Sequence, residues 1–236
     1  TRSFDIKMPK EINRLVIDGL SDYLFTAGMG SNSIVSREGA ELSHVYEVGN
    51  ILMDTLRFNH NRLQRPAVMD DQKLENGKYI VFTLNRKALI ADKENLGNMI
   101  YAMNKAAGNT PIIAVLRNNA KEVVSQLTAD MADIHIIDSL PYLEFGYLTA
   151  HAMGIITDSG NVAEEATFNN VPCITLNSYT EHIETVKQGS NILVGEDADK
   201  LEAAIKNMTG NNWKKCSLPD RWDGRTAERI VHILLN

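Results

Sequence analysis

One turn of the chain joins an apolar run to a helix-like segment and concentrates residues that can bind an anion. Within Gly154–Leu176, the run GIIT ends at Thr157 and is followed by Asp158-Ser159-Gly160-Asn161. Ligands of open α/β sheets bind outside the carboxyl ends of the strands, where the first amides and the positive dipole end of a helix face them. Gly160 lets the backbone approach an oxygen atom closely. The pattern therefore indicates a site suited to a diphosphate.

Two carboxylates follow this turn and admit two interpretations. Glu164 or Glu165 can hydrogen bond the hydroxyls of a ribose. In the structural alternative, Ser159 or Asn161 caps the helix and the glutamates complement its dipole. A single strand–turn–helix with one glycine does not choose between the two.

Two further turns follow apolar runs and can contribute to the same site. Thr180-Glu181 comes after the run CITL, one strand–helix unit beyond Ser159, and neighbouring units of a doubly wound sheet can share a cleft. Asn85-Arg86-Lys87 follows the run YIVFTL, where basic residues can meet a phosphate. Simple capping at Thr180 and a solvated loop at Arg86 are the alternatives.

Metal or cofactor chemistry has no support in the residue pattern. The six histidines show no His/Cys/Asp/Glu spacing typical of a metal site, and P-loop, GxGxxG and GxSxG motifs are absent from the sequence. We therefore expect no metal and no cofactor. His182 is the one histidine next to a candidate site residue, because it directly follows Thr180-Glu181.

Apolar runs alternate with amphipathic stretches along the chain, which predicts an α/β fold with a parallel sheet flanked by helices. Continuous apolar runs indicate strands buried on both faces. The expected strands are 23–26, 45–48, 79–84, 111–116, 134–137, 154–157, 173–176 and 191–194. The expected helices are 9–20, 95–107, 120–127, 142–151, 162–169, 181–188, 198–208 and 224–235. A hinge is expected at Gly49-Asn50, and 59–77 is interpreted as a loop.

Composition narrows the class of protein. The 236 residues carry a net charge of −6, which argues against bulk binding to nucleic acid or an anionic membrane. The sequence contains no apolar stretch of membrane-spanning length and no signal-peptide core at its start. Its two cysteines, Cys173 and Cys216, are far apart and suggest no disulfide framework. We expect a cytoplasmic protein.

Six segments, in order along the whole chain, resemble the non-hydrolysing UDP-N-acetylglucosamine 2-epimerases. They are RSFDIKMPKEINR (2–14), VYEVGNILMD (45–54), YIVFTLNRK (79–87), IITDSGNVAEE (155–165), TEHIETVKQGSNILVG (180–195) and WDGRTAERIVHI (222–233). The resemblance implies two Rossmann-like domains of the glycosyltransferase-B type, of which this chain matches about the last two thirds. It implies the tail of the first domain in 1–49, a nucleotide-binding domain in 50–220, and a closing helix in 221–236. By this comparison the chain is either a fragment or naturally truncated.

The resemblance also implies a reaction, in which UDP is eliminated to form a 2-acetamidoglucal and added back with inverted configuration at C2. UDP or a UDP-sugar would be held by Arg86, Ser159, Gly160 and Glu165, with Thr180 and Glu181 close by. Several catalytic positions differ from the family pattern. A family carboxylate falls at Lys10, with Glu11 keeping the next one, and a family histidine falls at Asn85. An arginine of the family falls at His182.

Three functional hypotheses follow from these matches and differences. The first is an active 2-epimerase represented by part of its chain. The second is a pseudoenzyme or uridine-nucleotide-binding module, which the residues Lys10 and Asn85 favour. The third is a glycosyltransferase of the same architecture, for which the sequence shows no acceptor site. A homo-oligomer is expected by resemblance, with no nucleic acid and no membrane as partner.

Overall fold

The computed structural model describes residues 5–37 and 44–236, and the strands within them form two parallel sheets. Six strands make the larger sheet, in the order β5-β4-β3-β6-β7-β8, and β1 pairs with β2 in the smaller one. The strands are β1 (Leu24–Thr26), β2 (Val45–Glu47), β3 (Ile80–Phe82), β4 (Ile112–Val115), β5 (Ile134–Ile137), β6 (Gly154–Thr157), β7 (Cys173–Thr175) and β8 (Asn191–Leu193). The order of the larger sheet reverses between β3 and β6, as in a doubly wound fold.

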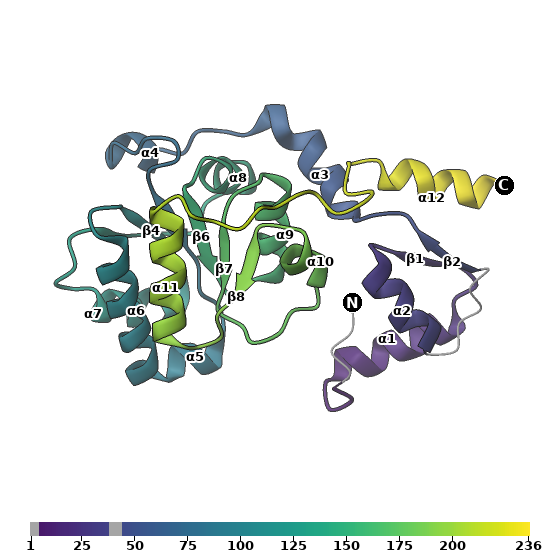
Figure 1. The fold of residues 1–236 in the computed structure, drawn as a ribbon, viewed down its shortest axis with the longest axis horizontal. Coiled ribbons are helices and arrows are strands. Elements are labelled where there is room, and N and C mark those ends of the chain that lie inside the picture. Colours follow the sequence, from purple (N-terminus) through teal and green to yellow (C-terminus); the bar gives the residue numbers. More distant parts are fainter. Residues whose placement is uncertain (1–4, 38–43) are drawn as a thin grey trace.

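Helices connect these strands and cover the sheet on both sides (Figure 1). They are α1 (Pro9–Leu20), α2 (Met29–Arg37), α3 (Ile51–Asn59), α4 (Val68–Asp71), α5 (Lys87–Ala91), α6 (Lys93–Ala107), α7 (Asn118–Leu127), α8 (Tyr142–Ala150), α9 (Gly160–Phe168), α10 (Ile183–Lys187), α11 (Ala198–Thr209) and α12 (Thr226–Leu235). A 3-10 turn, η2 (His60–Arg62), follows α3.

The core has two layers because neighbouring residues of a strand point to opposite faces of the sheet. On one face, Ile80 and Phe82 pack against α6, α7 and α11. On the other face, Val81 and Ile155 pack against α4, α8 and α9. Both sets are buried, which confirms the α/β class and the interpretation of the continuous apolar runs as strands covered on both sides.

The smaller sheet, with α1 and α2, forms a separate unit next to α10 (Figure 1). The chain passes from β2 through Gly49 into α3, and returns to this junction after α11, where α12 packs against α3. Gly49 has a φ of +97°, and a Cβ there would lie 2.1 Å from the carbonyl oxygen of Arg221. Glycine is therefore required at the expected hinge, because any other residue would be both strained and in collision with backbone.

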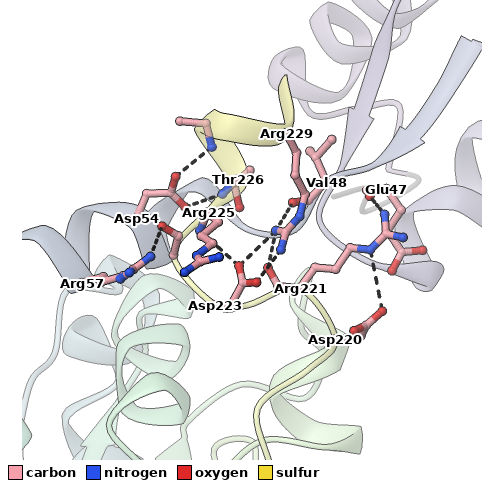
Figure 2. Close-up of polar contacts among 12 residues, drawn as sticks. Glu47, Val48, Asp54, Arg57, Asp220, Arg221, Asp223, Arg225, Thr226 and Arg229 are labelled. Carbon is pink, nitrogen blue, oxygen red and sulfur yellow. Dashed lines mark hydrogen bonds and ion pairs between the residues drawn. The ribbon is translucent and has the colours of Figure 1, made fainter. Parts of the chain in front are cut away.

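Polar contacts join the returning segment to the junction (Figure 2). The carboxylate of Asp54 in α3 accepts hydrogen bonds from the first amides of α12, those of Thr226 at 3.0 Å and Ala227 at 2.8 Å. Arg229 of α12 donates to the carbonyl oxygen of Val48 at 3.0 Å and forms an ion pair with Asp223. The C-terminal helix is thus attached to residues on both sides of Gly49.

All eight expected strands are present, two with the expected bounds and six slightly shorter, whereas several helices were not predicted. The sequence MGSNSIVSR of α2 is rich in weak helix formers, which explains its omission. Asn50 is the N-cap of α3 and accepts a hydrogen bond from the amide of Leu52, so the expected hinge is followed at once by a helix. The interpretation of 59–77 as a loop is corrected, because η2 and α4 lie within it.

Candidate functional site

A pocket of about 650 Å³ opens at the carboxyl ends of β3, β6 and β7, where the strand order reverses. Arg86, Ser159, Gly160, Thr180 and Glu181 all line it, although they come from three separate turns. Lys10 of α1, Asn85 and His182 also line it, so these three positions that differ from the family pattern face the same space. The expectation that neighbouring strand–helix units share one cleft is confirmed.

Asp158 fixes the two central turns relative to each other. Its Oδ2 accepts hydrogen bonds from the amides of Asn85 at 2.7 Å and Arg86 at 2.6 Å. Beneath it, the hydroxyls of Thr83 and Thr157 are 2.7 Å apart. Sequence reasoning placed Asp158 in the turn and assigned it no role, because its partners lie more than 70 residues away.

The amino end of α9 leaves backbone donors at the pocket. Ser159 is extended and makes no side-chain capping bond, and its own amide donates to the hydroxyl of Thr157 at 3.0 Å. The first intrahelical bond is from Ala163 to the carbonyl of Ser159 at 3.2 Å, so the helix itself does not use the amides of Gly160 and Asn161. The alternative of a capping role for the Ser159 side chain is therefore wrong, and these amides can bind an anion.

Arg86 forms part of the pocket wall and is held by its neighbours. Its guanidinium pairs with Glu196 at 2.5 Å and donates to the carbonyl oxygen of Leu176 at 3.0 Å. Near it, the buried Oδ1 atoms of Asp158 and Asn177 have no hydrogen-bond partner among the described residues. Unpaired buried acceptors of this kind mark a place where ligand donors or water are expected.

An ion-pair chain crosses from the pocket to α1. Glu181 pairs with Arg14 at 2.9 Å and lies 3.8 Å from the ammonium of Lys10. The hydrogen bond from Arg14, with its positive charge, lowers the pKa of Glu181 below its usual value. Glu11, the predicted catalytic carboxylate, does not line the pocket; it is buried and pairs with Arg14 at 3.3 Å.

The two adjacent glutamates of α9 point to different places. The Oε1 of Glu164 accepts a hydrogen bond from the side-chain Nδ2 of Asn50 at 2.6 Å and lies 2.8 Å from Nδ1 of His182. Glu165 lines a separate, small pocket with Tyr142 and Phe168. Burial, together with the charge of Glu164, raises the pKa of Glu165 to about 7. The structure therefore does not bring Glu165 to the predicted UDP-binding residues.

His182 lies over the first turn of α9. A Cβ added at Gly160 would be 2.7 Å from Cδ2 and 2.9 Å from Nε2 of its ring, so only glycine fits beneath it. His182 and Glu181 also line a second pocket of about 270 Å³, which reaches Asn50 and Trp222. The site thus extends from the larger sheet toward the first unit, where Trp222 donates to the carbonyl of Ala27 at 3.0 Å.

The described residues form neither a metal site nor a membrane-spanning helix. Across residues 5–37 and 44–236, no three His, Cys, Asp or Glu side chains are grouped so as to hold a metal ion. Within the same part of the chain, every helix is too short or too polar to span a membrane.

Comparison with known proteins places this geometry in a family. The profile of the family described as UDP-N-acetylglucosamine 2-epimerase matches residues 1–235. A UDP-N-acetylglucosamine 2-epimerase of Methanocaldococcus jannaschii is 35% identical over 99% of this chain and 66% of the relative. A UDP-2,3-diacetamido-2,3-dideoxy-D-glucuronate 2-epimerase of Pseudomonas aeruginosa is 31% identical over 89% of this chain and 58% of the relative. The chain spans about two thirds of the length of the curated relatives that it matches.

Solved structures agree with this result. The crystal structure of the Methanocaldococcus jannaschii enzyme in complex with UDP-GlcNAc and UDP has a TM-score of 0.79 to this chain at 34% identity, covering 99% of this chain and 66% of that one. The structure of a Neisseria meningitidis UDP-GlcNAc 2-epimerase, at 22% identity, has a TM-score of 0.86 and supports the fold, covering 99% of this chain and 67% of that one. On the profile match, the sequence identity and the shared fold, this chain belongs to the UDP-N-acetylglucosamine 2-epimerase family.

Proposed function

We propose that the chain forms the nucleotide-binding part of a UDP-N-acetylglucosamine 2-epimerase and binds UDP-N-acetylglucosamine in the pocket at the amino end of α9. The observation that carries the proposal is the amino end of α9, where the helix does not use the amides of Gly160 and Asn161 and where Gly160 lines a pocket with Arg86 and Lys10. Two amides and the helix dipole suit a pyrophosphate. The Methanocaldococcus jannaschii relative has been solved with UDP-GlcNAc and UDP bound, which supports this ligand class.

In the family reaction the proton on C2 of the sugar is removed and the bond between C1 and the diphosphate oxygen breaks. UDP leaves with both bonding electrons, and re-addition from the resulting glycal returns the proton to the opposite face of C2. Negative charge grows on the departing diphosphate, where the amides of α9 can stabilise it. Removal of the weakly acidic C2 proton requires a positioned base.

Base catalysis is the part of this reaction that the pocket supports least. Asn85 lines the pocket but cannot exchange a proton near neutral pH, and Lys10 stands where the family has a carboxylate. Glu11 lies outside the pocket. These residues favour a second candidate function, a UDP-sugar-binding protein with little or no epimerase activity, and we expect that behaviour of this polypeptide alone.

Calorimetric titration with UDP-N-acetylglucosamine tests the binding proposal. We expect saturable binding to the wild type and a loss of affinity of about tenfold or more in Gly160→Ala, because the added Cβ collides with His182 and moves it over the amides. Gly97→Ala in α6 is the matched control, since its Cβ would make only an ordinary contact of 3.6 Å with Leu127. Equal affinity of Gly160→Ala and the wild type would contradict the assigned site.

Proton exchange separates the two candidate functions. The protein is incubated with UDP-N-acetylglucosamine in heavy water, and deuterium at C2 is followed by NMR. We expect binding without appreciable incorporation, because Lys10 and Asn85 occupy the positions where the family has a carboxylate and a histidine. Incorporation together with formation of the C2 epimer would show that this chain is an active epimerase. UDP-2,3-diacetamido-2,3-dideoxy-D-glucuronate is the comparison ligand, because the Pseudomonas aeruginosa relative is named for it.

A further inference from the structure

The side chains of Asn50, Glu164 and His182 come from three distant segments and meet beside the pocket, where Glu164 orients the imidazole of His182. Glu164 of α9 accepts a hydrogen bond from Asn50 and lies 2.8 Å from Nδ1 of His182. Glu164 and Asn50 are buried, with exposed fractions of 5% and 8%, so the carboxylate is held away from bulk water. A carboxylate has no hydrogen to donate, so both groups that contact Oε1 of Glu164 must donate to it. The imidazole nitrogen that faces Oε1 must therefore carry a hydrogen. His182 Nδ1 is therefore the donor to Glu164.

That assignment leaves Nε2 as the atom at which His182 gains or loses a proton. Nε2 lies against the first turn of α9, 2.9 Å from the point where a Cβ of Gly160 would be. Among the described residues, no side chain or backbone group hydrogen bonds Nε2. The ring edge that carries Nε2 thus lies beside the amides that we assign to the diphosphate.

The fixed cations around the pocket already have carboxylate partners. Arg86 pairs with Glu196, and both Arg14 and Lys10 face Glu181. His182 has no further carboxylate on Nε2, and it can therefore supply a new positive charge when an anion arrives. The charged and titratable groups that line the two pockets with it are Lys10, Arg86, Asp158, Glu164, Tyr179, Glu181 and Glu184.

We propose that His182, oriented by Glu164, is a ligand of the diphosphate in this chain and that binding of a nucleotide-sugar is coupled to uptake of one proton at Nε2. A positive charge on His182 is favourable beside a bound diphosphate, so binding and protonation support each other. The inference deepens the proposed function and rests on it, because it concerns the same ligand.

The coupling fixes the direction of the pH dependence. If the bound state holds one proton more than the free state, affinity falls as pH rises, by up to about tenfold per pH unit. UDP-N-acetylglucosamine is the suitable probe, because its diphosphate is esterified at both ends and does not titrate near neutral pH. Free UDP carries a terminal phosphate that titrates near pH 6, which would mask the effect.

The experiment is a calorimetric series between pH 6 and pH 9 in buffers of different ionisation enthalpy. The wild type is expected to lose affinity with rising pH and to take up to one proton per ligand. His182→Arg keeps the charge at every pH and should bind with no pH slope and no proton uptake. His182→Gln should bind more weakly at low pH, also without a slope. His232→Gln, which removes an exposed histidine of α12, should retain the slope of the wild type.

Failure of the inference is distinguishable from failure of the proposed function. Tight binding by the wild type with a flat pH profile and no proton uptake would overturn the role of His182 and leave the pocket assignment intact. Absence of binding in both the wild type and His182→Arg would refute the proposed function. In that case the imidazole is titrated by NMR with and without inorganic pyrophosphate. A rise in the His182 titration midpoint would support the coupling, and an unchanged midpoint would overturn it.

Discussion

At the scale of single residues, the contrast between Glu164 and Glu165 is the clearest result. The two are adjacent in the sequence, yet one is hydrogen bonded to Asn50 and His182 and the other lies among Tyr142 and Phe168. Sequence reasoning could assign either of them to a ribose, because a helix turns by about 100° per residue and its start was not known closely enough. The helix begins at Gly160 instead of at Val162, so neither carboxylate lies in its first turn, where both were expected.

Glu165 gives a prediction of pH-dependent stability. Because burial raises its pKa to about 7 in the folded state, the carboxyl group favours folding below pH 4.5, and this contribution is lost as pH rises through 7. Glu165→Gln should therefore raise the free energy of unfolding at pH 8 by up to about 3 kcal/mol and leave it unchanged near pH 4. Urea denaturation at the two pH values measures the difference.

Glu122→Gln, on the exposed side of α7, is the matched control and should show no such pH dependence. The same Glu165 variant also tests the sequence-based assignment of a ribose ligand. Its affinity for UDP-N-acetylglucosamine should equal that of the wild type, because Glu165 does not line the larger pocket. A clear loss of affinity would restore Glu165 to the binding site.

At the scale of elements, the attachment of α12 depends on a capping group from a different helix. Asp54 of α3 accepts hydrogen bonds from the first two amides of α12, and Arg225 at the N-cap provides none from its own side chain (Figure 2). A carboxylate at a helix amino end satisfies free amides and complements the dipole. The position of α12 is therefore coupled to the junction at Gly49.

Asp54→Ala is expected to cost about 1 kcal/mol of stability and to release the start of α12. Hydrogen exchange should show faster exchange of the Thr226 and Ala227 amides than in the wild type, while the core strands keep their protection. Asp197→Ala is a reciprocal control, because Asp197 caps α11 through the amides of Asp199 and Lys200. If α12 keeps its protection in Asp54→Ala, the capping contacts do not determine its attachment.

At the scale of the whole molecule, α1 and α12 expose apolar side chains that the rest of the described chain does not cover. Val16 and Leu20 of α1 are 55% and 81% exposed, and Val231 and Leu235 of α12 are 54% and 80% exposed. Apolar faces of this kind usually mark interaction surfaces. The homo-oligomer expected from the family resemblance stays a prediction, and these residues give it a physical basis.

We expect this polypeptide to self-associate in solution, and light scattering after size exclusion measures its mass. Val16→Glu combined with Leu20→Glu should shift the population toward monomer, because each introduces a charge into the apolar face of α1. Tyr101→Glu, at a 64% exposed position of α6, is the control and should not change the mass. A wild type that is monomeric at high concentration would contradict the prediction.

Local pattern was enough to predict the eight strands and the α/β class. The central strands β3, β4, β6 and β7 are buried on both faces, which leaves continuous apolar runs in the sequence. The contacts that build the site could not be predicted in the same way. Asp158 reaches the amide of Asn85 across 73 residues, and Asn50 reaches Glu164 across 114. Such contacts exist because β3 and β6 are neighbours in the sheet and because α3, whose N-cap is Asn50, packs against α9. Strand order and the orientation of the two units depend on the packing of the whole chain, so only the tertiary structure decided which polar groups face the pocket.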